Sequence, residues 1–461
     1  MSNAAQATAA GSQEAWRRAA LVNARIDALP KFGLSLAGAF ALLVLFFFAN
    51  YDIGVFTITI PYIETQFHLQ TTDLSWPVTA NLLAYAVGAY LCGHIADRFG
   101  RRRGLLVTAL LLGLGGLLTS LSWNLATFTI FRFVTGAGMG AVLALATAYL
   151  GELAPKAKRG RIISTIYLVQ AIVLVAVNFA SLPVLQIGTG WRFLLAFGAL
   201  VIFVPFAFRD KAMMESPRWL AEKGNLDEAE RLVGLIEARL RVQGPPPEIP
   251  PAPDLNEART ELPIRELLRR PLLGRVLVVV VFWFAYYVAF YGFSSYRAII
   301  LGGLGVTVSN AIFITVLSTI TGPIACIVLM LLIERMERRT IVIIGCALQV
   351  VSLILLMSGL GIVAFTAANL IYSFMVSIVT PPAFTYSAEM FPTRARGTAT
   401  AIGDGMGHIG GAVAPFIVLP ILASAGAGWT VIVVAIGVAI AAVSLFFGPR
   451  TKERALTEIA S

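Results

Sequence analysis

Charged residues are scarce in this chain of 461 residues. Asp, Glu, Lys and Arg make up only 13% of it, about half the share that is usual in soluble domains. Apolar side chains make up 58%, against about 45–50% in an average soluble protein. This composition excludes a soluble enzyme and predicts a protein embedded in the lipid bilayer.

Cysteine and histidine are also sparse, with three residues of each. Cys92, Cys326 and Cys346 lie within apolar stretches, so we expect small buried side chains rather than a disulfide framework or a zinc site. No Gly-Lys-Ser/Thr loop suggests ATP-driven transport. We therefore expect no metal and no other cofactor.

The chain is rich in apolar runs of about 20 residues, the length at which a helix crosses a bilayer. Twelve runs lie at 34–60, 74–95, 104–122, 124–151, 162–187, 192–208, 273–301, 307–333, 340–360, 362–388, 398–423 and 428–448. The alternating pattern of β-barrel strands is absent, and lipid forces backbone groups to pair within each segment. We predict an all-α membrane protein with twelve transmembrane helices.

The basic residues are placed asymmetrically. Setting aside Arg132, Arg192 and Arg297 leaves 32 of the 35 Lys and Arg residues (35 − 3), and these fall in the two tails or in alternate loops that start with loop 2–3. Loops 1–2, 3–4, 9–10 and 11–12 hold none. The bias places both termini in the cytoplasm. It also explains the net charge of +10 without nucleic acid as a partner.

Two charged motifs recur at one offset. Residues 97–102 (DRFGRR) return at 334–339 (ERMERR), and 152–160 (E-x-x-P-x-x-x-R-G) return at 389–397, which is 237 positions later in both cases (334 − 97 and 389 − 152). A single offset indicates a duplicated unit. We therefore expect two pseudo-symmetric six-helix bundles.

The expected organisation has five parts. It comprises a cytoplasmic N-terminal tail at 1–32 without a cleavable signal peptide, a bundle at 33–208, a cytoplasmic linker at 209–272, a second bundle at 273–448 and a cytoplasmic tail at 449–461. The linker contains an amphipathic helix at 227–241, a proline-rich break at 244–253 and a second short helix near 261–270. Short tails and linker give no sign of a regulatory domain.

Several motifs resemble the major facilitator superfamily. Residues 93–102 (GHIADRFGRR) are similar to its loop 2–3 motif, and 132–140 (RFVTGAGMG) to its helix 4 motif. The two E-x-x-P-x-x-x-R-G motifs and 215–220 (ESPRWL) resemble its sugar-porter branch. The resemblance implies an alternating-access carrier that acts as a monomer in the cytoplasmic (inner) membrane, with a small-molecule site between the bundles.

Other positions depart from the sugar-porter pattern. Tyr167 replaces the usual helix 5 Gln, Phe384 replaces the helix 10 Trp, and helix 7 lacks the Gln pair. Residues 162–187 also lack the Gly-Pro-Gly of drug antiporters. Segments 25–30 (RIDALP), 51–52 (YD) and 391–410 resemble the niacin and aromatic-acid proton symporters, although His408 stands where an Arg is usual.

Ionisable residues inside a membrane are costly and therefore mark functional sites. Asp52 and Arg132 are expected to pair, so that protonation of Asp52 releases Arg132; the alternative is a static pair that fixes helix packing. Asp404 and His408 lie four apart on one helical face. They form either a second proton site, a substrate contact or a hydrogen-bonded pair that faces a neighbouring helix.

Aromatic residues of helices 7 and 10 suit a planar carboxylate, although they also suit ordinary membrane packing. The candidate substrate-binding residues are Tyr167, Trp283, Tyr287, Phe290, Tyr291, Arg297, Phe384 and Tyr386. The candidate cytoplasmic gate comprises Gly93, Asp97, Arg98, Gly100, Arg101, Arg102, Glu152, Arg159, Glu334, Arg335, Arg338, Arg339, Glu389 and Arg396. Its basic residues also set topology, and Gly136 and Gly140 predict close helix contact.

The first functional expectation is proton-coupled import of a small organic or aromatic carboxylate. Symport of a sugar or polyol is the second, and efflux of a drug-like solute is the third. From another class, a sensor that binds solute without net flux stays open. Na⁺ is the alternative driving ion.

Overall fold

The computed structural model describes residues 3–204, 213–242, 272–333, 335–392 and 395–451, together with the single residues 247, 267 and 269. All regular structure in these ranges is helical, which confirms the predicted all-α class. Eleven helical stretches in them are long and apolar enough to cross a membrane. The predicted sixth span is represented by a shorter apolar helix, Gly190–Phe203.

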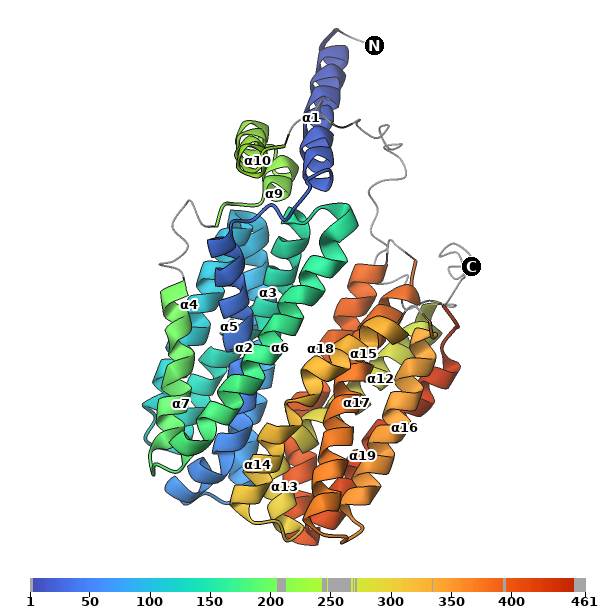
Figure 1. Ribbon diagram of the computed structural model, residues 1–461. Helices are drawn as coiled ribbons and strands as arrows, with labels where there is room; N and C mark the ends of the chain where they lie inside the picture. Colours follow the sequence, from blue (N-terminus) through green and yellow to red (C-terminus); the bar gives the residue numbers. More distant parts are fainter. Residues whose placement is uncertain are drawn as a thin grey trace.

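Two bundles stand side by side in Figure 1. The first contains α2 (Leu36–Gln66), α3 (Ser75–Phe99), α4 (Arg101–Ser120), α5 (Leu125–Leu153), α6 (Arg159–Leu185), α7 (Gly190–Gly198) and the 3-10 turn η3 (Ala199–Phe203). The second contains α12 (Leu272–Ser294), α13 (Arg297–Gly303), α14 (Val308–Ser318), α15 (Thr321–Leu332), α16 (Arg338–Leu356), α17 (Ile362–Glu389), α18 (Arg396–Ala425) and α19 (Ala427–Ser444).

Two predicted spans are divided. The run at 273–301 forms α12 and α13 with a break at Ser295 and Tyr296, and the run at 307–333 forms α14 and α15 with a break at Thr319 and Ile320. At the second break the N–H groups of Thr319 and Ile320 donate to the carbonyls of Val316 and Leu317, which lie three residues earlier instead of four. In membrane proteins such breaks occur where the backbone lines a cavity.

Glycine sets the closest helix contact. A Cβ added to Gly136 would lie 2.1 Å from the carbonyl oxygen of Asn81, and one on Gly140 would lie 1.9 Å from that of Tyr85. Only a residue without a side chain fits there, so the backbones of α3 and α5 touch. The close contact predicted from the Gly-xxx-Gly step is confirmed.

Three further helices cover one end of the first bundle: α1 (Asn3–Asp27), α9 (Pro217–Glu222) and α10 (Leu226–Leu240). We call this the charged end and the opposite one the far end; α1 lies at the charged end (Figure 1). The predicted helix at 227–241 is α10. Helix α1 was not predicted, and the predicted helix at 261–270 lies outside the described residues except for Leu267 and Arg269.

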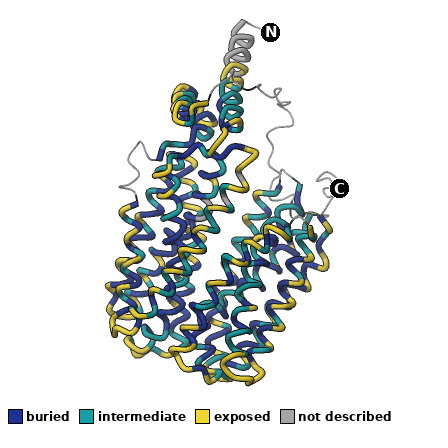
Figure 2. Tube along the Cα trace, viewed as in Figure 1, coloured by how far each residue is buried: buried dark blue, intermediate teal, exposed yellow. Residues whose placement is uncertain are grey.

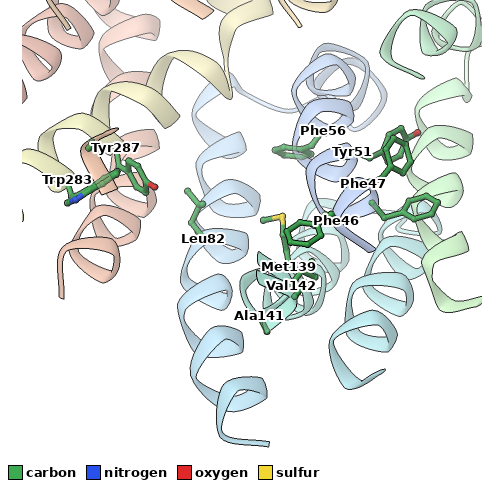
Figure 3. Packing of buried hydrophobic residues seen from close by; sticks show 14 of the residues in the cluster. Phe46, Phe47, Tyr51, Phe56, Leu82, Met139, Ala141, Val142, Trp283 and Tyr287 are labelled. Atoms are coloured by element: carbon green, nitrogen blue, oxygen red, sulfur yellow. The ribbon is translucent and has the colours of Figure 1, made fainter. Parts of the chain in front are cut away.

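Apolar packing fills each bundle. Figure 2 shows buried residues along the inside of both bundles and exposed residues at their ends. Large apolar residues such as Leu114, Val351 and Ile354 face outward, as expected for helices surrounded by lipid. Figure 3 shows the aromatic residues Phe46 and Phe56 of α2 within the first bundle. The buried apolar residues of the two halves belong to one continuous cluster, with a small satellite around Ala325 and Ile341 in the second half.

Candidate functional site

A cavity of about 370 Å³ lies between the two bundles. Helices α2 and α6 form its wall on one side, and α12, α13, α14, α15 and α17 form the other. Thr319 of the second helix break lines the cavity, as do Ser294 and Arg297, which flank the first break. Most of its polar lining is neutral: Asn50, Thr57, Tyr167, Gln170, Asn178, Ser294, Thr315, Ser318, Thr319, Thr321, Ser373 and Ser377. The arrangement offers many hydroxyl and amide groups to a small polar molecule.

The amide groups were missed by the sequence analysis. Gln170 is 5% exposed and lines the cavity one turn beyond Tyr167, which was taken to replace the usual helix 5 Gln. Asn50 and Asn178 use their side-chain N–H groups on the carbonyls of Phe46 and Leu174 four residues earlier. These hydrogen bonds do not involve the amide oxygens of Asn50 and Asn178, which can accept a hydrogen bond from a solute. Polar residues within apolar runs were the available signal.

Three of the expected substrate-binding residues line this cavity. They are Tyr167, Phe290 and Arg297. The Tyr167 hydroxyl lies 3.2 Å from the Thr147 hydroxyl. The Arg297 guanidinium donates from Nη1 to Ser373 Oγ at 2.9 Å. It is the one cation among the described lining residues, and no acidic residue joins it there.

The other aromatic candidates lie elsewhere. Tyr291 lines only a smaller cavity, whereas Trp283, Tyr287, Phe384 and Tyr386 line neither. Trp283 and Tyr287, labelled in Figure 3, pack on α18: added Cβ atoms on Gly403 and Gly407 would lie 3.0 Å and 2.9 Å from their rings. Trp283 and Tyr287 of α12 therefore belong to a helix interface, where glycine residues of α18 leave room for their rings.

Two of the four lie against other groups of the second bundle. Phe384 packs against Trp283 with ring centroids 4.3 Å apart. The Tyr386 hydroxyl donates to the carbonyl of Pro449 at 2.7 Å. Neither contact involves the cavity between the bundles.

Asp52 and Arg132 form a buried ion pair. Arg132 Nη1 donates to Asp52 Oδ1 at 2.8 Å, and both residues are at most 6% exposed. The guanidinium also lies over the Phe56 ring at 4.3 Å. Because α2 runs from Leu36 to Gln66, Asp52 lies near the middle of this helix.

The pair has unused hydrogen-bonding capacity. Asp52 Oδ2 and Arg132 Nε are buried without a hydrogen-bond partner. A cavity of about 30 Å³ lies beside Arg132 and shares Ile53 and Thr57 with the larger cavity. A space of this size holds about one water molecule. Arg132 lines this small cavity, whereas Asp52 is not among the lining residues of either one.

His408 and Asp404 lie at the boundary between the bundles. His408 Nδ1 is 2.9 Å from the Asp404 carbonyl oxygen and 3.5 Å from its carboxylate Oδ1. The ring contacts Tyr85 of α3 and Tyr287 of α12. Neither residue lines the central cavity. The His408 ring therefore packs against α3 and α12, and the roles of the pair as a second proton site or a substrate contact stay predictions.

The charged motif of the first half forms a network at the charged end. Arg101 bridges Asp97 and Glu152, and its Nε lies 2.9 Å from Glu152 Oε1. Arg218 donates to the Glu152 carbonyl at 2.8 Å and pairs with Asp27 of α1 at 2.6 Å. These contacts tie the motif to the helices that cover this end.

Glu215 precedes α9, and its carboxylate lies at the N-terminus of α4. Its carboxylate accepts from the backbone N–H groups of Arg102 and Ser216, and Gly100 approaches it with a φ of 113°. A carboxylate at a helix N-terminus is favourable. Burial raises the pKa of the Glu215 carboxyl above its ordinary value, against the opposing effect of these N–H groups.

The repeat in the second half forms a similar network. Arg338 pairs with Glu389 at 3.0 Å, and Arg396 donates to the Ala388 carbonyl. Thr451 donates to Glu337 and Glu389, so the chain after this bundle returns to the motif as Glu215 does in the first half.

The remaining gate candidates make other contacts or cannot be placed. Arg98 lies over the Phe99 ring, and Arg339 donates to two carbonyls that follow α19. Arg335 lies in the loop before α16. A Cβ added to Gly93 would have no atom within 4 Å. Glu334 and the side chain of Arg159 lie outside the described residues.

A larger apolar groove is a poor candidate site. Its volume is about 570 Å³, and it lies between α12 and α19. Apart from Ser444, its lining is apolar or glycine, so it provides no groups that could bind an ion or a polar solute.

Comparison with known proteins gives a consistent result. The model of the Major Facilitator Superfamily matches residues 42–415 and 298–461. YncC of Bacillus subtilis (strain 168) is 31% identical over 433 residues, which cover 89% of this chain and 90% of YncC. The arabinose-proton symporter of the same organism is 27% identical over 381 residues, which cover 77% of this chain and 78% of the symporter.

A solved structure agrees in fold. The inward-open xylose transporter XylE of E. coli superposes with a TM-score of 0.70 at 19% identity, covering 91% of this chain and 98% of that one. At this identity the likeness shows the fold alone. The expected kinship with niacin and aromatic-acid symporters gains no support from these proteins, whereas the likeness to the arabinose-proton symporter supports the resemblance to sugar porters.

Proposed function

Because the chain belongs to the Major Facilitator Superfamily, we propose that it carries a small hydroxylated solute, such as a sugar or polyol, together with a proton. It is a multi-pass membrane transporter and not an enzyme. The observation that carries the proposal is the central cavity with its twelve neutral hydroxyl and amide side chains. Such groups exchange hydrogen bonds with the hydroxyl groups of a sugar.

The cavity favours a sugar over the planar carboxylate that was expected first. The rings of Trp283 and Tyr287, which were to stack on an aromatic acid, are packed against α18. The hydroxyl-rich wall matches the sugars named for the arabinose-proton symporter and XylE. The solute would occupy the space between the bundles and leave by whichever end is open.

Asp52 is the proton site in this proposal. Its carboxylate and Arg132 neutralise each other inside the bundle, where an unpaired charge is strongly unfavourable. When Asp52 binds a proton, Arg132 loses its counter-ion and must find another arrangement. The protonation state of Asp52 would thus bias the two bundles toward one orientation, which couples proton entry to solute entry.

Orientation follows from charge. The charged end would face the cytoplasm, as the positive-inside bias implies, and the chain would act as a monomer in the cytoplasmic membrane. H⁺ rather than Na⁺ is the proposed driving ion, since Asp52 is paired with a guanidinium instead of several oxygen ligands.

Uptake into proteoliposomes tests the proposal. Labelled arabinose, xylose, glucose, nicotinate and benzoate are offered with and without an inward proton gradient, in sodium and in sodium-free buffer. One pH unit stores about 1.4 kcal/mol, enough for about tenfold accumulation with one proton. We expect gradient-driven accumulation of at least one sugar without sodium. Accumulation of nicotinate or benzoate alone would contradict the hydroxylated solute.

A further inference from the structure

Arg297 is a buried cation without an acidic partner. The residue is 8% exposed, and it lines the central cavity as the first residue of α13. Nη1 donates to the Ser373 hydroxyl, while Nε is buried and has no hydrogen-bond partner. The guanidinium carbon lies 5.3 Å from the Phe293 ring centre and 5.7 Å from that of Tyr372. None of these neighbours carries a negative charge.

Arg132 shows what this environment requires. That guanidinium is also buried, and the carboxylate of Asp52 balances its charge at 2.8 Å. A buried charge without a counter-ion is strongly unfavourable. No acidic side chain lines the cavity in the described part of the chain. The positive charge at Arg297 is therefore left for a group that enters from outside.

The residues around Arg297 indicate what else a molecule that binds there must contain. Across the cavity lie the amide side chains of Asn50, Gln170 and Asn178, and beside Arg297 lie hydroxyl groups such as those of Ser294 and Ser377. Amides and hydroxyls suit neutral hydroxyl groups, whereas a guanidinium fork suits a carboxylate. The cavity thus has one anion-binding corner and a wall for polyols.

We infer that the transported solute is a sugar acid, such as a uronate or aldonate, with its carboxylate bound by Arg297. The inference rests on the proposed function and narrows its substrate class. Binding of the carboxylate would supply the missing counter-ion. The ring or chain hydroxyl groups would meet the neutral wall.

The charge of the solute changes the energetics of transport. A neutral sugar that moves with one proton carries one positive charge across the membrane, so a potential contributes about 2.3 kcal/mol per 100 mV. A sugar acid that moves with one proton carries no net charge. Uptake driven by the proton gradient should then be independent of the membrane potential.

Matched substrate pairs test the inference. Glucose and glucuronate, galactose and galacturonate, and mannose and mannuronate are compared as competitors in solute exchange across proteoliposomes without any gradient. For at least one pair, the wild-type protein should bind the uronate about tenfold more tightly than the neutral sugar, as expected for charge-assisted hydrogen bonds. Exchange needs no proton coupling, so it reports on specificity alone.

Variants of Arg297 identify the residue. Arg297→Gln should remove the preference for the uronate, so that both members of a pair compete equally, and its thermal unfolding in detergent shows that the variant is folded. Arg297→Lys should keep part of the preference. Arg192→Gln is the matched control, because Arg192 donates to the carbonyls of Ser120 and Ser122 outside the cavity. It should leave the preference unchanged.

The outcomes separate the two proposals. Equal or weaker binding of every uronate, or a preference that survives Arg297→Gln, overturns the sugar acid but leaves the hydroxylated solute. Uronate uptake that rises with an inside-negative potential also overturns an electroneutral sugar acid with one proton. If no member of any pair is exchanged, both the substrate class and this inference fail.

Discussion

The imidazole of His408 lies flat against the ring of Tyr85, with centroids 4.1 Å apart and ring planes at 12°. Tyr85 belongs to α3 and His408 to α18, so this stack joins the two bundles. Toward the far end, Thr79 donates to the carbonyl of Ala412 at 2.7 Å. A carrier that opens at its far end must separate these surfaces.

His408→Ala should favour the state that is open at the far end. An aromatic stack contributes about 0.5–1.5 kcal/mol, so its loss should raise the population of that state about twofold to tenfold. Spin labels at Leu121 and Leu360, in the far-end loops of the two bundles, report this opening as a longer distance.

Trp123→Ala is the control for the stack. Trp123 contacts Phe131 within the first bundle, so its loss should leave the distance distribution unchanged. If His408→Ala also leaves the distribution unchanged, the stack does not hold the bundles together. The role of Asp404 and His408 as a second proton site stays a separate prediction.

Asp52→Asn should abolish accumulation against a gradient and spare exchange of solute down its gradient. The amide cannot take up a proton at physiological pH, so the energy of the gradient no longer reaches the solute. The measurement is uptake and exchange by the same proteoliposomes, with and without an imposed pH difference.

The variant also leaves Arg132 buried without a counter-ion. Removal of one partner of a buried pair destabilises a protein by about 3–5 kcal/mol, so a lower melting temperature is expected. Surviving exchange shows that the protein is still folded. Accumulation that persists in Asp52→Asn would place the proton site elsewhere.

Gly88→Ala should loosen the contact between α3 and α5. The added Cβ would lie 1.8 Å from the carbonyl oxygen of Ala137, a backbone atom that cannot turn aside. Overpacking of this kind costs about 1–3 kcal/mol. Gly93→Ala in the same helix meets nothing within 4 Å and should be neutral or slightly stabilising. Thermal unfolding in detergent distinguishes the two variants.

The sequence predicts the spans and the buried pair because both depend on local signals. Long apolar runs must be helices in lipid, and a lone Asp and a lone Arg inside them must find each other. The lining of the cavity is less accessible. Trp283 and Tyr287 lie on an inward face, but that face meets α18 rather than the cavity. The periodicity of apolar residues distinguishes the buried face of a helix from its lipid-facing side. It does not show whether a buried residue contacts another helix or lines the cavity.

Helix α1 was missed for a related reason. Its first half is polar, and only Val22, Ile26 and Leu29 mark a buried stripe at helical spacing, continuing just beyond its end. Three apolar residues are too few to predict an amphipathic helix unless the helix that they pack against is known. That partner is α10, where Leu232, Val233 and Ile236 are buried.

Acid should release α1 from α10. Arg18 and Arg25 of α1 pair with Glu230 and Glu237 of α10 at 2.7 and 2.5 Å. The Arg18 hydrogen bond lowers the pKa of Glu230 below its ordinary value of 4.5, so the stabilisation is present above that pH and is lost as the pH falls through the lowered value. The distance between spin labels on α1 and α10 should increase in acid. It should also increase at neutral pH in a double variant that combines Glu230→Gln with Glu237→Gln.

Glu228→Gln is the control for these variants. It should not release α1, because Glu228 pairs with Arg231 in its own helix. A docked α1 in the double variant would show that its remaining contacts hold it, namely the apolar packing and the pairs of Arg18 with Asp227 and of Asp27 with Arg218.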